Sequence, residues 1–280
     1  MEVNSTMSVP NKFDVEGMVC LITGGSGVLG SEIAHALGEN GATVVLLARG
    51  EEKLRKVGEE LGEAGIDHLT VSASVLDRAE LEAAAETIID EYGQIDVLIN
   101  AAGGNSPDAT TGPDTSFFDL SVEGIQQVLN VNFTGTVLAS QVFGKYMVEE
   151  GTGCILNVSS MNAFTPLTKI PAYSGAKAAV SNFTEWLAVH ISHNYSTDIR
   201  VNAIAPGFFL TEQNRYLLID EETGDYTGRG QAIIDHTPQD RFGRPEDLST
   251  TVLWLISPGA EFVHGASIPI DGGFSAFSGV

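Results

Sequence analysis

Residues 19–30 read Val-Cys-Leu-Ile-Thr-Gly-Gly-Ser-Gly-Val-Leu-Gly. The first four are apolar and predict a buried strand, and helix-spaced apolar residues follow over 31–39. Glycines between a strand and a helix let backbone amides approach a pyrophosphate, and the helix N-terminus adds positive potential. A tight turn without a ligand is the alternative. The stretch therefore predicts the first βα unit of an α/β fold, with a nucleotide-binding loop at 23–30.

The same alternation of short apolar runs and amphipathic stretches continues along the chain. Near-continuous apolar strands are typical of a parallel sheet covered on both faces, so we expect a doubly wound, Rossmann-like α/β fold in one domain, 1–280. Further strands are expected at 42–47, 69–73, 95–99, 154–158, 199–204 and 267–270, and helices at 51–61, 77–91, 117–130, 135–150 and 173–193. Asp77 is expected to cap the helix at 77–91, and Gly93 to stop it.

Two segments stand outside this alternation. Residues 1–14 form an N-terminal extension, and 208–240 is an irregular stretch rich in polar and aromatic residues after the sixth strand. A long excursion at the carboxyl end of a strand is typical of a lid over a site, with a disordered loop as the alternative. We expect 208–240 to be a substrate lid.

Composition narrows the class of function. The chain has 280 residues, with 14 Lys and Arg against 37 Asp and Glu, and a formal net charge of −23. Such a chain repels a phosphate backbone, which argues against general nucleic-acid binding. A solvated acidic surface and a docking face for a cationic partner both remain open.

Other global features predict a cytoplasmic protein with no membrane partner. No apolar run is long enough to cross a bilayer, and Met1 to Pro10 lacks the pattern of a secretory signal. Cys20 and Cys154 lie in apolar runs and are expected to be buried free thiols. The six histidines do not pair with cysteines or acids at ligand spacing, so we expect no metal site.

Tyr173 and Lys177 are four residues apart in a predicted helix, and Ser160 precedes Tyr173 by thirteen. Residues at this spacing share a helix face, so the ammonium can lie beside the phenol. A nearby cation favours the phenolate and lowers the pKa of a tyrosine toward neutrality, which suits it to proton transfer with an alcohol or carbonyl. An ordinary helix face is the alternative.

These motifs together resemble the short-chain dehydrogenase/reductase family over essentially the whole chain. Residues 23–30 resemble its TGxxxGxG loop, although Val28 stands where glycine is usual and Gly27 precedes it. The remaining matches, in order, are Asn100-Ala101-Ala102-Gly103, Asn132, Ser160 with Tyr173 and Lys177, Pro206-Gly207, Thr211, and Asp271-Gly272-Gly273.

The resemblance implies a nicotinamide cofactor, NAD or NADP, and a role for each catalytic residue. Ser160 would polarise the substrate carbonyl, Tyr173 would be the general acid or base, and Lys177 would lower the pKa of the tyrosine and bind the nicotinamide ribose. Asn132 would hold a water that links the lysine to solvent. The alternative for Ser160 is a cap at the end of a strand. The alternative for Asn132 is a polar helix residue whose hydrogen bonds are satisfied within the protein. Cofactor contacts are expected from Thr23, Gly24, Ser26, Gly27, Leu29, Gly30, Arg49, Ser74, Val75, Asn100, Ala101, Ala102, Gly103, Tyr173, Lys177, Pro206, Gly207, Phe209 and Thr211.

Cofactor choice depends on the end of the second strand. An acidic residue there would bind the ribose 2′-hydroxyl, but the chain has Ala48 followed by Arg49. A guanidinium suits a 2′-phosphate, which favours NADP; stacking on the adenine and exposure to solvent are the alternatives for Arg49. Ser74-Val75 stands where the family often has Asp-Val, so the adenine contact there is expected to be altered.

The substrate region resembles that of the D-mannonate oxidoreductases (fructuronate reductases) of the short-chain type, which implies a keto sugar acid as the small-molecule substrate. Its hydroxyl groups would meet amides and hydroxyls, and its carboxylate would meet a cation. The expected substrate contacts are Asn105, Ser160, Asn162, Gln213, Asn214 and Arg215, with Arg229 and His236 as further cations. A structural role for the arginines, in the lid or at a subunit interface, is the alternative.

The resemblance also implies a homotetramer, assembled mainly through the helices within 117–150 and 172–193.

Two other functions remain open. One is a reductase of another carbonyl, such as a gluconate, a 3-oxoacyl thioester or a hydrophobic ketone. The other is a nucleotide sensor without turnover.

Overall fold

A seven-stranded parallel sheet forms the centre of the computed structural model, which describes residues 12–211 and 214–279. The strand order is β3-β2-β1-β4-β5-β6-β7, so the winding reverses between β1 and β4, where ligands of such sheets bind. The predicted fold class is confirmed. The strands are β1 (Val19–Thr23), β2 (Thr43–Ala48), β3 (His68–Ser72), β4 (Val97–Asn100), β5 (Gly153–Val158), β6 (Ile199–Pro206) and β7 (Ser267–Ile270).

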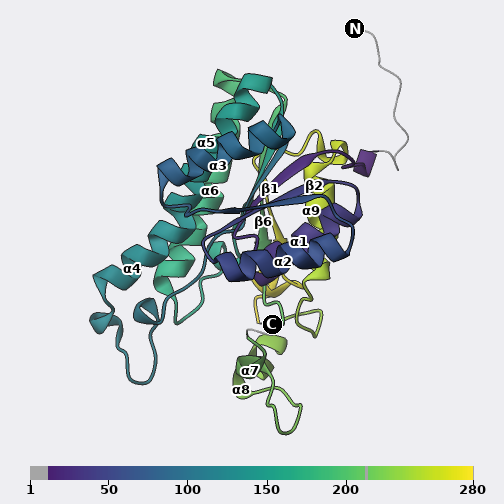
Figure 1. Ribbon diagram of the computed structural model, residues 1–280. Helices are drawn as coiled ribbons and strands as arrows, with labels where there is room; N and C mark the ends of the chain where they lie inside the picture. The colour runs from purple at the N-terminus through teal and green to yellow at the C-terminus, as the bar shows by residue number, and fades with distance from the viewer. Residues whose placement is uncertain (1–11, 212–213, 280) are drawn as a thin grey trace.

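Helices cover both faces of the sheet and bury one apolar layer on each (Figure 1). One face carries α1 (Val28–Glu39), α2 (Glu51–Glu63) and α9 (Glu246–Ile256). The opposite face carries α3 (Arg78–Tyr92), α5 (Gly135–Glu150) and α6 (Pro171–Asn194). Cys20 and Cys154 are free thiols buried in the first layer, as predicted. No helix within the described ranges is both long and apolar enough to span a bilayer.

Local sequence signals explain where two of these helices begin and end. The Asp77 carboxylate accepts hydrogen bonds from the N–H groups of Ala79 and Glu80, and Gly93 ends α3 in the left-handed region with φ of 78°. Both predictions are confirmed. Helix α1 begins at Val28, earlier than the apolar pattern indicates, because Gly27 is its N-cap and the glycine loop runs directly into the helix.

The predicted helix at 117–130 is wrong at its start. Residues 117–119 form a 3₁₀ turn, and α4 (Val122–Leu129) begins after Ser121, whose hydroxyl accepts a 2.9 Å hydrogen bond from Gly124 N–H. A π-helical segment, Asn130–Thr134, then joins α4 directly to α5. The helices predicted at 117–130 and 135–150 are therefore joined into one continuous helical segment, and its π-helical part lies at the site described below.

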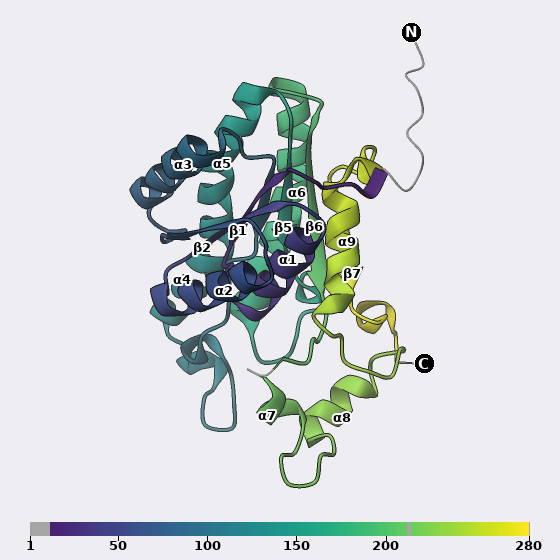
Figure 2. The same ribbon diagram turned by 45° about the vertical axis from the view of Figure 1, so that its right-hand side comes forward.

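The excursion after β6 projects beyond the carboxyl ends of the strands (Figure 2). It contains α7 (Arg215–Leu218) and α8 (Gly228–Ile234), which pack through a small apolar cluster onto Met161, the residue after Ser160. The excursion therefore contacts the predicted catalytic segment. Residues 1–11 of the predicted extension, and Gln213, lie outside the described residues.

Candidate active site

Ser160, Tyr173 and Lys177 converge at the carboxyl end of β5. Ser160 follows the strand, and the other two side chains lie one turn apart on α6. The Lys177 Nζ atom is buried 5.6 Å from the centroid of the Tyr173 ring and donates a 2.8 Å hydrogen bond to the carbonyl of Val158. The predicted pairing of phenol and ammonium on one helix face is confirmed.

The electrostatics of this pair differ from the expectation. Burial raises the pKa of Tyr173, and a hydrogen bond from Ser160 is the influence that lowers it. Burial also lowers the pKa of Lys177 from its ordinary value of 10.5 to about 8. The expected lowering of the Tyr173 pKa toward neutrality therefore does not appear, because burial disfavours both charged forms and the ammonium is directed to the Val158 carbonyl.

Asn132 lies in the π-helical segment and is fully buried. Its amide donates to the carbonyls of Gly104 (2.7 Å) and Val128 (2.8 Å), and its Oδ1 accepts from Gly104 N–H (3.1 Å). Both amide hydrogens are thus used within the protein. The side chain therefore fixes the loop after β4, and its predicted contact with a water stays a prediction.

A cavity of about 600 Å³ opens between the loops after β1, β2 and β4, at the reversal of strand order. Gly24 has φ of +68°, and a Cβ there would lie 2.8 Å from the Ala102 backbone, so only glycine lets the two loops meet. Bare backbone beside the N-terminus of α1 suits a pyrophosphate. Eight of the predicted cofactor residues line this cavity: Gly24, Ser26, Gly27, Arg49, Val75, Ala101, Ala102 and Gly103.

Gly103 lies between this cavity and the predicted catalytic residues. A Cβ at Gly103 would lie 2.6 Å from Asn132 Oδ1 and 3.3 Å from Lys177 Nζ. Gly103 thus lies on the cavity wall with the predicted catalytic lysine close behind it.

Other predicted cofactor residues hold the loops from behind. Thr23 Oγ1 accepts a 3.2 Å hydrogen bond from Ala102 N–H, and Gly30 leaves room for the carbonyl of Gly24, which a Cβ would approach to 2.5 Å. Asn100 is buried and donates to Ser140 Oγ (3.0 Å) and to Asn157 Oδ1 (2.9 Å), away from the cavity. Leu29 packs against the core, and the Ser74 hydroxyl accepts from Leu76 N–H.

The sequence interpretation missed several cavity residues. Lys53 is the most informative, because it lies in the first turn of α2, four residues after Arg49, and brings a second cation to the same cavity. Its spacing from Arg49 was the available signal. Val131 lies in the π-helical segment, whose irregular geometry the sequence does not reveal. The remaining unpredicted lining residues are Leu47, Ala48, Gly50 and Ala73.

The predicted substrate residues fall into two groups. Asn162 is buried against Ser160, to which its Nδ2 donates at 3.2 Å. Asn214 instead holds the loop after β6, since it accepts from Thr211 N–H (2.9 Å) and donates to the Phe209 carbonyl (2.8 Å). Asn105 is exposed and donates to Thr110 Oγ1, and Arg215 is exposed at the start of α7.

Pro206 and Gly207 bring the end of β6 to Ser160. The Pro206 carbonyl accepts a 3.4 Å hydrogen bond from Ser160 Oγ, and Gly207 N–H donates to the carbonyl of Ile270 on the neighbouring strand. A Cβ at Gly207 would lie 2.6 Å from Cβ of Asp271, so these two segments need the glycine to approach one another.

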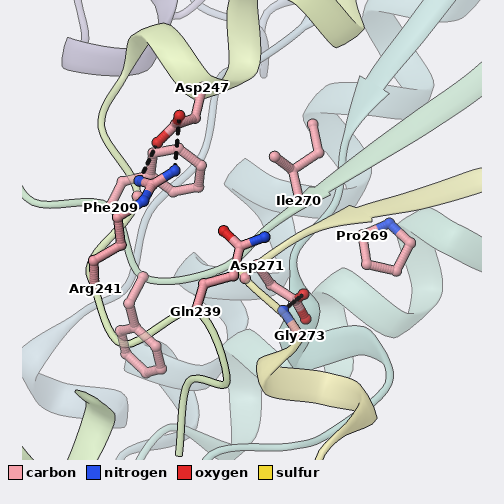
Figure 3. A pocket seen from close by; sticks show the side chains of 11 residues that line it. Phe209, Gln239, Arg241, Asp247, Pro269, Ile270, Asp271 and Gly273 are labelled. Atoms are coloured by element: carbon pink, nitrogen blue, oxygen red, sulfur yellow. Dashed lines mark hydrogen bonds and ion pairs between the residues drawn. The ribbon is translucent and has the colours of Figure 1, made fainter.

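A second cavity, of about 410 Å³, lies where β7 meets the base of the excursion (Figure 3). The Phe209 ring lines it and packs on Gly243, so this ring does not line the cavity between the β1, β2 and β4 loops. Arg241 pairs with Asp247 on the wall, and Asp271 accepts from Gly273 N–H (Figure 3). These pairings hold the start of α9 and the segment after β7 in place.

Comparison with known proteins agrees with this geometry. The family model for short chain dehydrogenases matches residues 18–222. An oxidoreductase of Bacillus subtilis named UxuB, whose activity is uncharacterized, is 49% identical over 97% of this chain and 100% of its own.

Two solved structures are similar over nearly the whole chain. A protein from Haemophilus influenza, provisionally assigned as a D-mannonate oxidoreductase and holding NAD, is 45% identical with a TM-score of 0.89, over 95% of this chain and 98% of its own. A gluconate 5-dehydrogenase from Burkholderia cenocepacia, in complex with NADP and tartrate, is 27% identical with a TM-score of 0.83, over 95% and 98%.

The family match covers most of the chain, and the parallel sheet, the glycine loop and the paired Tyr173 and Lys177 lie where such an enzyme needs them. The chain therefore belongs to the short-chain dehydrogenase family and is an oxidoreductase that acts on CH–OH groups.

Proposed function

We propose that this enzyme interconverts a keto sugar acid and the corresponding hydroxy sugar acid, of the fructuronate and mannonate type, with a nicotinamide cofactor. The observation that carries the proposal is at Gly103, which lines the cavity suited to a dinucleotide and where an added Cβ would lie 3.3 Å from the buried Lys177 Nζ, beside Tyr173. A site of this kind places a proton donor next to a hydride donor.

In the proposed reduction, the substrate carbonyl lies between Ser160 and Tyr173. Ser160 donates its hydroxyl hydrogen to the carbonyl oxygen, and Tyr173 delivers the proton that completes the alcohol. Lys177 lies beside the phenol and close to Gly103 of the cavity wall, and Asn132 fixes the loop of that wall. The bound cofactor supplies or removes the hydride, and the same groups act in reverse during oxidation.

The sugar-acid class is supported by the excursion after β6 and by the relatives. Arg215 lies in α7, Arg229 in α8 and His236 just after α8, within the excursion that projects beyond the carboxyl ends of the strands (Figure 2), and a cation there suits a carboxylate. The two similar solved structures are provisionally assigned to D-mannonate and named for gluconate, respectively. A gluconate-type substrate is therefore the second candidate.

The test is cofactor oxidation by the purified enzyme with a panel of carbonyl compounds. The panel contains fructuronate, 5-ketogluconate, a 3-oxoacyl thioester and a hydrophobic cyclic ketone, each with NADH and NADPH. We expect the highest kcat/KM with a keto sugar acid. A preference for the thioester or the cyclic ketone would overturn the substrate class, and cofactor binding without any turnover would indicate a sensor.

We propose that the enzyme prefers NADP. Arg49 and Lys53 line the end of the cavity that follows β2, and two cations there suit the 2′-phosphate of the adenosine ribose. The Haemophilus structure holds NAD and the Burkholderia structure holds NADP, so relatives of this chain use both.

We propose a cytoplasmic homotetramer. An apolar groove of about 440 Å³ runs between α5 and α6, and Trp186, 55% exposed, stacks on His190 beside it. Large exposed aromatic side chains in a row along one helix are typical of an interface between subunits. The proposed interface uses the helices that the sequence interpretation named.

A further inference from the structure

We infer that Asn162 is a positioning residue that directs the hydroxyl hydrogen of Ser160 toward the reacting oxygens, and not a direct ligand of the substrate. The inference rests on the proposed catalytic role of Ser160. It assigns to Asn162 a function different from the hydroxyl contact expected from the sequence.

The orientation of the Asn162 amide is fixed by its neighbours. Its Oδ1 accepts a 3.1 Å hydrogen bond from Leu167 N–H and a 3.3 Å hydrogen bond from Ser174 Oγ. An amide nitrogen could accept neither bond, so Oδ1 must face these donors and Nδ2 must face Ser160. The side chain is only 6% exposed, which leaves little surface for a substrate.

The hydrogen-bond capacity of the Ser160 hydroxyl then determines its direction. A serine oxygen has two lone pairs and one hydrogen. Asn162 N–H donates to this oxygen at 3.3 Å, and Asn162 Nδ2 donates at 3.2 Å, so one residue occupies both lone pairs. Ser160 is left with its hydrogen alone, and it can act only as a donor.

Few acceptors are within reach of that hydrogen. The Pro206 carbonyl lies at 3.4 Å, beyond the usual distance for a hydroxyl donor, so this bond is weak. Ser160 also donates to the Tyr173 oxygen. A substrate carbonyl placed between Ser160 and Tyr173 would meet a hydroxyl already oriented to donate, which lowers the cost of polarising it.

Asn162→Asp is the decisive substitution, because the shape is kept while the donor to Ser160 becomes an acceptor. The carboxylate would attract the Ser160 hydrogen away from Tyr173 and the substrate. We expect kcat to fall by about 100-fold, as when one oriented donor is lost, with little change in KM. The basic limb of the pH profile of kcat should also move, because Tyr173 loses the donor that favours its phenolate.

A double-mutant cycle with Ser160→Ala separates positioning from direct contact. If Asn162 acts through Ser160, Asn162→Asp costs little further activity in the Ser160→Ala background. An equal loss in both backgrounds, or an effect confined to KM, would overturn the inference. Asn194→Asp makes the same chemical change at the far end of α6 and should leave kcat unchanged.

A second variant and a spectroscopic titration keep the inference testable if Asn162→Asp fails to fold or the substrate is different. If Asn162→Asp does not fold, Asn162→Ala removes the same donor without adding a charge, and the same cycle applies. Ultraviolet difference absorbance against Tyr173→Phe follows the Tyr173 phenolate with no substrate present, and Asn162→Asp should move this titration to higher pH. The kinetic measurements use whichever carbonyl compound the enzyme turns over. They therefore still test the role of Asn162 if the sugar-acid proposal fails. An unmoved titration would contradict the positioning role.

Discussion

Lys177 Nζ lies 5.6 Å from the centroid of the Tyr173 ring, while its 2.8 Å hydrogen bond goes to the Val158 carbonyl. The ammonium therefore lies beside the phenol without neutralising the cost of its burial, and the pKa of Tyr173 stays raised. In the protein alone the tyrosine is a protonated acid at neutral pH, which is the form needed for reduction.

Tyr173→Phe should lower kcat by about 10³-fold, because the variant keeps the ring and loses the group proposed to transfer the proton. Cofactor affinity should change little, since Tyr173 does not line the cavity between the β1, β2 and β4 loops. Steady-state kinetics and fluorescence titration with NADPH measure the two effects. Tyr92→Phe, at the end of α3, is the matched control, and a wild-type rate in Tyr173→Phe would refute the assigned role.

Lys177→Met should reveal the cost of burying the ammonium. The pKa of Lys177 is about 8 in the folded protein and 10.5 unfolded, so the unfolded chain binds more protons between these values. The unfolding free energy of the wild type, relative to the variant, should therefore rise with pH from 8 to 10.5 and stay flat below 8. The rise should be about 3 kcal/mol, since each pKa unit corresponds to about 1.4 kcal/mol. Urea unfolding at several pH values measures it, and a difference independent of pH would contradict the shift.

Gly103→Ala should disrupt the junction between the cavity and the catalytic group. The new Cβ would lie 2.6 Å from Asn132 Oδ1, so the loop or the side chain must move, at a cost of about 1–3 kcal/mol of stability. We expect weaker cofactor binding and a lower kcat. Gly104→Ala is the neighbouring control, because a Cβ there has no heavy atom within 4 Å. Equal effects of the two substitutions on thermal unfolding and kinetics would argue against the contact.

The features that the sequence predicted correctly have local causes. Asp77 and Gly93 act on the helix between them, and the four-residue spacing of Tyr173 and Lys177 fixes their common face. Helix α9 was missed although its signals are also local. Glu246 and Asp247 begin it, and apolar residues follow at helical spacing.

The features that the sequence could not predict concern side chains whose partners are distant in sequence. Asn132 bonds Gly104, 28 residues earlier, and Asn100 bonds Asn157, 57 residues later. Asn132 and Asn100 both matched a family motif. The orientation of their side-chain amides, however, depends on how β4, β5 and α5 pack together. The direction of the Tyr173 pKa shift depends on burial, which spacing along a helix does not reveal.

Arg49→Ala should weaken NADPH binding by about tenfold, the loss expected when one charged hydrogen bond to a phosphate is removed, and should change NADH binding much less. Lys53→Ala should have the same effect, because Lys53 lines the same end of the cavity. Lys56→Ala removes an equal charge from α2 but pairs with Glu60 outside the cavity, and it should affect neither cofactor. Equal losses for NADH and NADPH in fluorescence titrations would remove the basis for NADP preference.

Trp186→Glu should split the proposed tetramer into smaller species. The indole is 55% exposed, lies between Phe183 and His190, and lines the apolar groove on α5 and α6. A carboxylate buried there without a partner would cost several kcal/mol at each copy of the interface. Sedimentation velocity measures the assembly. Ala83→Glu adds the same charge to the exposed face of α3 and should leave the assembly intact. A tetramer that survives Trp186→Glu would place the main interface on another face of the molecule.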